Sequence, residues 1–129
     1  ATFLKLGLIP GDGGAWLLPK IIGWSRASEL FFTGEIIDAS KALEWGLVSE
    51  VVATQHLDAT VGKLAQRICA QPPNSLRMTK QLMRDALESD FRALMNHSAS
   101  LQSILHHTED HDEAVDSFFK KTNARFEGR

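Results

Sequence analysis

The residues best suited to chemistry stand in a glycine-rich stretch, PGDGG, at positions 10–14. Glycines permit positive φ angles and let a ligand approach the backbone amides closely. If a helix begins just after them, its free amides offer a partial positive charge to an oxyanion or a phosphate. A plainer interpretation is a tight turn in which the Asp12 carboxylate caps the helix. The residues alone favour this capped turn, because the full pattern of a nucleotide-binding loop is not present.

A second candidate is HHTEDH, residues 106–111, which is dense in imidazoles and carboxylates. His107 and His111 are four residues apart, so on one continuous helix they would share a face at the spacing of metal ligands. Thr108, however, is typical of the residue that caps a new helix. We therefore expect the histidine pair to straddle a helix boundary, and we predict a solvated junction and no metal.

Lys120 and Lys121 end the last helical pattern of the chain. Cations at that position complement the helix dipole, which is the simplest interpretation, although a phosphate could use the same charges. No Ser/His/Asp order and no CxxC pattern stands out.

The elements that must position these residues are predicted to be mostly helices. Apolar residues at helical spacing predict helices over residues 55–71, from a cap at Asn74 or Ser75 onward, over residues 90–107, and from Thr108 onward. About four amphipathic helices therefore make up the second part of the chain.

The first third is predicted to be a compact region of turns, short helices and short strands. The strands are expected at residues 3–9 and 47–52, and Pro19 is expected to bend or restart the helix after the glycines. The other two helices are expected from Ser25 to a stop at Gly34, and over residues 41–45 with Asp38 or Ser40 as the cap.

The composition excludes several classes of protein. With 129 residues, 43% of them hydrophobic, and a formal charge of -2, the chain can build a core and gives no reason to expect a nucleic-acid partner. Cys69 is the single cysteine, and the first residues do not resemble a secretory signal, so a cytoplasmic location is expected. No apolar stretch approaches the ~20 residues of a membrane helix, so no membrane partner is expected.

Three segments, taken together, resemble the enoyl-CoA hydratase/isomerase (crotonase) superfamily. They are LGLIPGDGGAWLLPKIIG, SRASELFFTGEIIDASKALEWGLVSEVV and AVDSFFKKTNARFEGR, which occur in the family's order and at fitting distances. The resemblance spans nearly the whole chain. It implies a mainly α fold, the C-terminal portion of a crotonase-like fold: the end of a spiral ββα core (residues 1–53), followed by a helical oligomerisation region (residues 54–129).

The resemblance also implies a reaction, the hydration or isomerisation of an enoyl-CoA in fatty acid metabolism. In the family two backbone amides hold the thioester carbonyl, and both are implied to belong to segments upstream of residue 1. Two glutamates act as acid and base in the hydratases. One is implied to lie upstream as well, and Phe3 stands at the position of the other. Asp12 is then a weak candidate for a substitute carboxylate.

Further residues carry over one at a time from the resemblance. Phe3, Leu6 and Gly11 fall where the family lines its acyl-thioester pocket, and Lys121 matches a lysine that contacts the nucleotide end of CoA. Gln102 falls where some members have an aromatic residue beside the adenine. The resemblance implies an acyl-CoA substrate, no separate cofactor, and a homo-oligomer, a trimer or hexamer.

Two functions therefore remain open at this point. One is an acyl-CoA hydratase/isomerase-like protein that is catalytic only as a complete chain. The other is a non-catalytic oligomerisation module or a truncated fragment, which would keep the helices without an active site.

Overall fold

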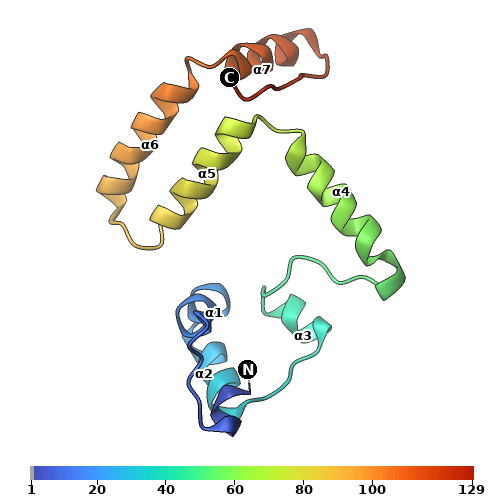
Figure 1. Cartoon of the computed structure of the whole chain (residues 1–129), viewed down its shortest axis with the longest axis vertical. Coiled ribbons are helices and arrows are strands. Elements are labelled where there is room, and N and C mark those ends of the chain that lie inside the picture. Colours follow the sequence, from blue (N-terminus) through green and yellow to red (C-terminus); the bar gives the residue numbers. More distant parts are fainter. Residues whose placement is uncertain (1) are drawn as a thin grey trace. The chain divides into compact units, whose positions relative to one another are not determined.

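The computed structural model describes residues 2–129, and this part of the chain is helical with no β-strand. Its contacts divide the chain into two units, Ala1–Leu57 and Asp58–Arg129, whose elements are coloured along the sequence in Figure 1. The interpretation of residues 1–53 as a core remnant and residues 54–129 as an oligomerisation region stays a prediction.

The first unit is organised around a pair of packed helices. A 3-10 helix, η1 (Phe3–Leu6), precedes α1 (Gly14–Ile22), α2 (Trp24–Thr33) and α3 (Ala39–Glu44), and a second 3-10 helix, η2 (Thr54–His56), follows. The core of this unit consists of Ile22, Ala27, Leu30, Phe31 and Trp45. These side chains come from α1, α2 and the end of α3, so burial of one shared apolar cluster holds the short helices together.

Both predicted strands are wrong for the described residues. Residues 3–6 form η1, and residues 47–49 are bends followed by irregular backbone, without strand pairing. The physical reason is that a strand is defined by hydrogen bonds to a neighbouring strand, and residues 2–129 provide no such neighbour. A short apolar run next to a proline can then form a tight helical turn.

The helix boundaries in the first unit agree in part with the sequence. Gly34 ends α2 in a left-handed conformation, and the Asp38 carboxylate accepts a hydrogen bond of 2.7 Å from the Lys41 amide at the start of α3. Asp38 is therefore the cap of α3, and Ser40 is not. Ser25 is not a cap either, because α2 already begins at Trp24. Pro19 does not interrupt α1, since a single proline removes only one of its backbone hydrogen bonds.

The second unit is a series of longer helices. They are α4 (Leu57–Cys69), α5 (Pro73–Asp85), α6 (Phe91–Leu105) and α7 (Glu109–Lys120). This arrangement confirms the helices predicted over residues 55–71 and 90–107 and from Thr108 onward. Within the unit, α5 and α6 run side by side (Figure 1) and pack against each other. Between them, the His97 Nδ1 atom lies 3.1 Å from the Asp85 Oδ2 atom.

The helix caps of the second unit agree with the sequence at α6 and α7 but not at α5. The side chains of Asp90 and Thr108 accept hydrogen bonds from amides of the first turns of α6 and α7, as expected for helix caps. The predicted caps of α5, Asn74 and Ser75, are wrong, because the helix begins before either of them, at Pro73. A proline at the first helical position has no N–H group that needs a cap. Asn74 is thus available for a different contact, described below.

None of the helices that the structure resolves within residues 2–129 has the length and apolar character needed to cross a membrane. Cys69 lies at the end of α4 as an exposed free thiol.

Candidate functional site

The glycine-rich stretch forms the turn that leads into α1. The Gly11 amide donates to the Ile9 carbonyl (2.8 Å), and the Gly14 amide donates to the Asp12 carboxylate (2.9 Å). The predicted tight turn and the bond from Asp12 to a free amide are therefore confirmed, but Asp12 as the helix cap is wrong. The cap residue itself is Gly13, whose carbonyl accepts the first hydrogen bonds of the helix. Asp12 stands one position earlier and reaches forward with its side chain.

The three glycines of this turn are present for different reasons. Gly13 has φ +91°, a conformation that side chains disfavour. At Gly14 an added Cβ would lie 3.0 Å from the Asp12 Oδ1 atom and 3.5 Å from the Phe31 ring, so a side chain here would press on the carboxylate that forms the turn. Gly11 has neither constraint: its φ is not positive, and an added Cβ would meet nothing within 4 Å among the described residues. Folding of this unit therefore does not account for a glycine at position 11.

An apolar hollow of about 360 Å³ lies beside the turn. Its wall is contributed by η1, the turn itself, α1 and α2, and Ser28 contributes the one hydroxyl group among the lining residues. The lining residues are Leu4, Ile9, Pro10, Ala15, Pro19, Trp24, Ala27, Ser28, Phe31 and Phe32. Such a surface can accept an alkyl or acyl group by removing apolar surface from water.

The residues expected at an apolar pocket are only partly near this hollow. Phe3 is half-buried and Leu6 is 73% exposed, and neither lines it, whereas Leu4 of the same 3-10 helix does. Residues three apart share a face of a 3-10 helix, so Phe3 and Leu6 point together and Leu4 points elsewhere. Gly11 is exposed and directly follows Pro10 of the lining. If residues 3–6 had been interpreted as a helical turn, their spacing would have separated Leu4 from Phe3 and Leu6 and indicated it as a lining residue.

Asp12, the weak candidate for catalysis, is exposed. One of its carboxylate oxygens is used by the Gly14 amide, and the other has no hydrogen-bond partner among residues 2–129. The residue therefore acts first as a turn-forming group, and it retains one oxygen that could accept a proton or a hydrogen bond.

The histidine-rich junction differs from its predicted form in one respect. Helix α6 ends at Leu105 and α7 starts at Glu109, so the boundary between His107 and His111 is confirmed. The ring that contacts His111 belongs instead to His106, with 3.2 Å between the His106 Nδ1 and His111 Nε2 atoms. In residues 2–129 there is no group of three or more His, Cys, Asp or Glu side chains arranged to hold a metal ion.

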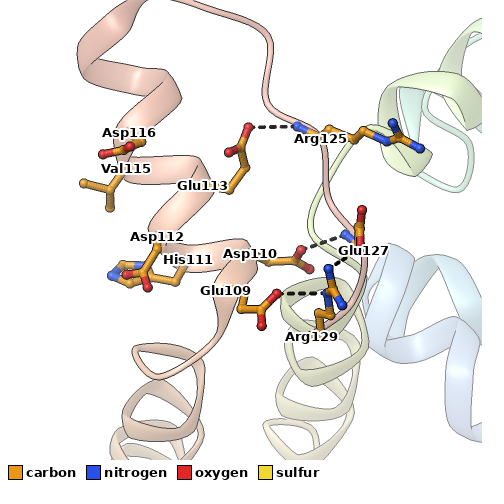
Figure 2. A pocket seen from close by; sticks show the side chains of 10 residues that line it. All are labelled: Glu109, Asp110, His111, Asp112, Glu113, Val115, Asp116, Arg125, Glu127 and Arg129. Atoms are coloured by element: carbon orange, nitrogen blue, oxygen red, sulfur yellow. Dashed lines mark hydrogen bonds and ion pairs between the residues drawn. The ribbon is translucent and has the colours of Figure 1, made fainter.

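A polar hollow of about 630 Å³ lies between α7 and residues 122–129, which we call the tail segment (Figure 2). Asp110 is only 4% exposed, and its two carboxylate oxygens accept hydrogen bonds from the amides of Glu127 (2.7 Å) and Gly128 (2.9 Å). Glu113 accepts a further bond from the Arg125 amide (3.2 Å). This arrangement was not predicted from the sequence, since acidic residues in the first turn of a helix are already explained locally by the helix dipole.

The two lysines at the end of α7 have different surroundings. The Lys120 ammonium lies 2.7 Å from the Asp116 carboxylate, and this hydrogen bond and its opposite charge raise the pKa of Lys120 above its ordinary value. The Lys121 ammonium has no hydrogen-bond or ion-pair partner within residues 2–129. Lys121 is also the only described non-glycine residue with a positive φ, 53°. It is therefore the cation of this pair that an anionic ligand could use.

Comparison with known proteins places these features in a family. The profile of the family described as enoyl-CoA hydratase/isomerase matches residues 1–129. The chain is 34% identical over 128 residues to the 1,2-epoxyphenylacetyl-CoA isomerase of Escherichia coli K12, covering 99% of this chain and 49% of that protein. It is 31% identical over 121 residues to the crotonyl-CoA hydratase of Syntrophomonas wolfei, covering 94% of this chain and 46% of that protein.

The structure gives the same result. The crystal structure of the enoyl-CoA hydratase of Bacillus anthracis matches with a TM-score of 0.96 and 31% identity, over 99% of this chain and 50% of that one. The chain thus spans about half the length of these relatives. The match confirms the predicted fold class, a mainly helical portion of a crotonase-like fold. By its profile, its relatives and its fold, the chain belongs to the enoyl-CoA hydratase/isomerase family.

Proposed function

We propose that this chain forms part of a protein that binds an acyl-CoA thioester and hydrates or isomerises an enoyl-CoA. The observation that carries the proposal is Gly11, a glycine that the backbone conformation and the packing of its own unit do not require. A thioester with its pantetheine arm is thin enough to pass along a turn without side chains. The named activities of the relatives, a CoA-ester isomerase and a crotonyl-CoA hydratase, support this choice of ligand.

Each contact is proposed separately. The hollow beside Pro10 would take apolar atoms of the acyl group, and Gly11 would lie against the thioester arm. Phe3 and Leu6 are proposed at the edge of the same ligand, since both belong to η1 together with Leu4 of the hollow. Lys121 would contact the phosphates at the nucleotide end of CoA, which its unpaired ammonium suits. The thioester is the substrate, and no further cofactor is proposed.

The reaction itself requires an acid and a base. In hydration, the oxygen of water bonds to the β carbon of the enoyl group while a proton is delivered to the α carbon. In isomerisation, a proton leaves one carbon and another returns at a different position. Asp12 is the one carboxylate of the turn, and we assign it only a secondary role, because its first oxygen is occupied by the Gly14 amide.

A second candidate function is an oligomerisation module without chemistry of its own. The observation that favours it is the exposure of Phe118 (79%) and Phe119 (77%), two adjacent aromatic residues of α7. Exposed aromatic side chains of this size are typical of surfaces that become buried in an assembly. A trimer or hexamer is the proposed state. The lone cysteine supports a reducing, cytoplasmic setting for either function.

Calorimetric titration of the full-length protein with acetyl-CoA tests the proposal, together with a spectrophotometric assay of crotonyl-CoA hydration. Saturable binding that weakens in Gly11→Ala supports the acyl-CoA function. Absence of acetyl-CoA binding, combined with a stable trimer or hexamer in light scattering, would reject it in favour of the module. If the parent protein hydrates crotonyl-CoA and Asp12→Asn does not, Asp12 has a catalytic role in addition to its role in the turn.

A further inference from the structure

The tail segment reverses direction after α7 and returns along the helix to its first turn (Figure 2). Besides the two bonds to its carboxylate, Asp110 donates its own amide to the Arg129 carbonyl (3.0 Å). The start of α7 and residues 127–129 are therefore joined by three hydrogen bonds. Each of them uses backbone groups of the tail segment, which has no helix of its own to satisfy them.

The burial of Asp110 shows that these bonds are specific. Aspartate is almost never fully buried unless its charge is compensated, because removing a carboxylate from water costs much free energy. Both oxygens of Asp110 accept backbone N–H donors, and hydrogen bonds to an ionised acceptor are about twice as strong as neutral ones. The compensation holds only while residues 127 and 128 stay in place.

Two further contacts fix the tail segment along its length. Glu113 holds the Arg125 amide, and the Asn74 side chain donates to the Gly128 carbonyl (2.9 Å), which attaches the tail to α5. Arg129 also pairs with Glu109 and Glu127, but these charges are at least half exposed, so the ion pairs contribute little. The half-buried and buried carboxylates of Glu113 and Asp110 are the principal attachments.

This arrangement has a consequence at Lys121, where the chain turns. Its φ of 53° and ψ of 42° are left-handed, and the Thr122 amide completes the turn by donating to the Ser117 carbonyl (3.0 Å). A residue with a Cβ disfavours this conformation, and it persists where surrounding contacts determine it. The attachments of residues 125–128 to α7 are those contacts, since they require the chain to reverse at Lys121.

We propose that Asp110 and Glu113 form a latch on the tail segment and thereby hold Lys121 in the turn that presents it to the phosphates of CoA. Asp110 and Glu113 are positioning residues, because they act through Lys121 and touch no ligand. The inference rests on the nucleotide contact proposed for Lys121. It adds that this contact depends on two carboxylates near the opposite end of α7.

The test compares Asp110→Asn, Lys121→Ala and their double variant in the full-length protein. Asp112→Asn is the matched control, because it removes the same charge from the same helical turn while its side chain points away from the tail segment (Figure 2). Amide hydrogen exchange at Glu127 and Gly128 reports on the latch. Affinity for acetyl-CoA relative to acetyl-pantetheine, which has no nucleotide, reports on Lys121.

In Asp110→Asn we expect faster exchange at both amides and about fivefold weaker acetyl-CoA binding, the scale of one exposed ion pair, with unchanged acetyl-pantetheine binding. The double variant should bind acetyl-CoA no more weakly than Lys121→Ala alone, since one residue acts through the other. A purely structural role would weaken both ligands equally. If Asp110→Asn does not fold, Glu113→Ala is the alternative, because it removes only the bond to the Arg125 amide. It should likewise speed up exchange and weaken acetyl-CoA binding without changing acetyl-pantetheine binding.

Three outcomes would overturn the inference. Unchanged exchange at Glu127 and Gly128 would show that no latch exists. Faster exchange with unchanged acetyl-CoA affinity would separate the latch from Lys121, while the proposed function would stand if Lys121→Ala still weakens binding. Lys121→Ala without effect on acetyl-CoA would reject the nucleotide contact itself, and the inference with it.

Discussion

Replacing Gly11 by alanine should leave the fold intact and impair ligand binding. An added Cβ at this position has open space within 4 Å among the described residues, and the backbone angle is not one that requires glycine. Replacing such a glycine stabilises a protein by about 0.4 to 1 kcal/mol, because the unfolded chain loses conformational freedom. The free energy of unfolding of Gly11→Ala should therefore equal or slightly exceed that of the parent.

Binding should respond in the opposite direction. If the thioester arm passes against the turn, the added methyl group occupies part of its path. Forcing an extra methyl group into a packed contact costs about 1 to 3 kcal/mol, which corresponds to roughly 5- to 150-fold in Kd. Urea unfolding measures the first effect, and calorimetric titration with acetyl-CoA measures the second.

Two further glycines serve as controls. Gly62, in the interior of α4, also has open space around it and no positive φ, so Gly62→Ala should stabilise the protein without changing the affinity for acetyl-CoA. Gly13→Ala should destabilise the first unit by about 1 to 2 kcal/mol, because of its φ of +91°. Acetyl-CoA binding by Gly11→Ala with the parental Kd would refute the reasoning, as would a loss of stability as large as that of Gly13→Ala.

Other expected outcomes concern stability and protonation. Leu30→Ala should lower the free energy of unfolding by about 2 to 5 kcal/mol, since Leu30 is 5% exposed in the core of the first unit. Leu64 is 48% exposed, so Leu64→Ala should cost far less in the monomer. Chemical unfolding measures both effects. Asp38→Ala should cost about 1 kcal/mol in the same assay through loss of the α3 cap, and an unchanged midpoint would contradict that assignment. Asp116→Asn should return the pKa of Lys120 toward 10.5, as followed by NMR titration. Because the folded pKa is raised, this contact stabilises the fold below 10.5, and its contribution is lost as pH rises through the folded pKa. Near neutral pH the contribution is fully present and should not vary with pH.

Local signals along the chain predicted the helices well. Asp38, Asp90 and Thr108 each precede a helical pattern, and each accepts a bond from a first-turn amide. Such caps depend on neighbours within three residues, so the sequence contains all the information that they need. The same holds for the turn at Asp12 and for the position of α7.

Features that depend on distant partners were not predictable in this way. The expected strands at residues 3–9 and 47–52 require a pairing neighbour, and their apolar pattern does not say whether one is present. The burial of Asp110 depends on Glu127 and Gly128, which lie 17 and 18 residues further along the chain. An acidic residue in a first turn has an adequate local explanation in the helix dipole, so nothing near Asp110 indicated its second role.

The separations between the partners of the tail segment also suggest an order of assembly. Its bonds to the carboxylates of Glu113 and Asp110 span 12 to 18 residues, whereas the bond from Asn74 to Gly128 spans 54. Closing a short loop loses less chain entropy and happens faster than closing a long one. The hairpin of α7 and the tail segment should therefore form first as a local folding unit, and its docking onto α5 should follow as a later step.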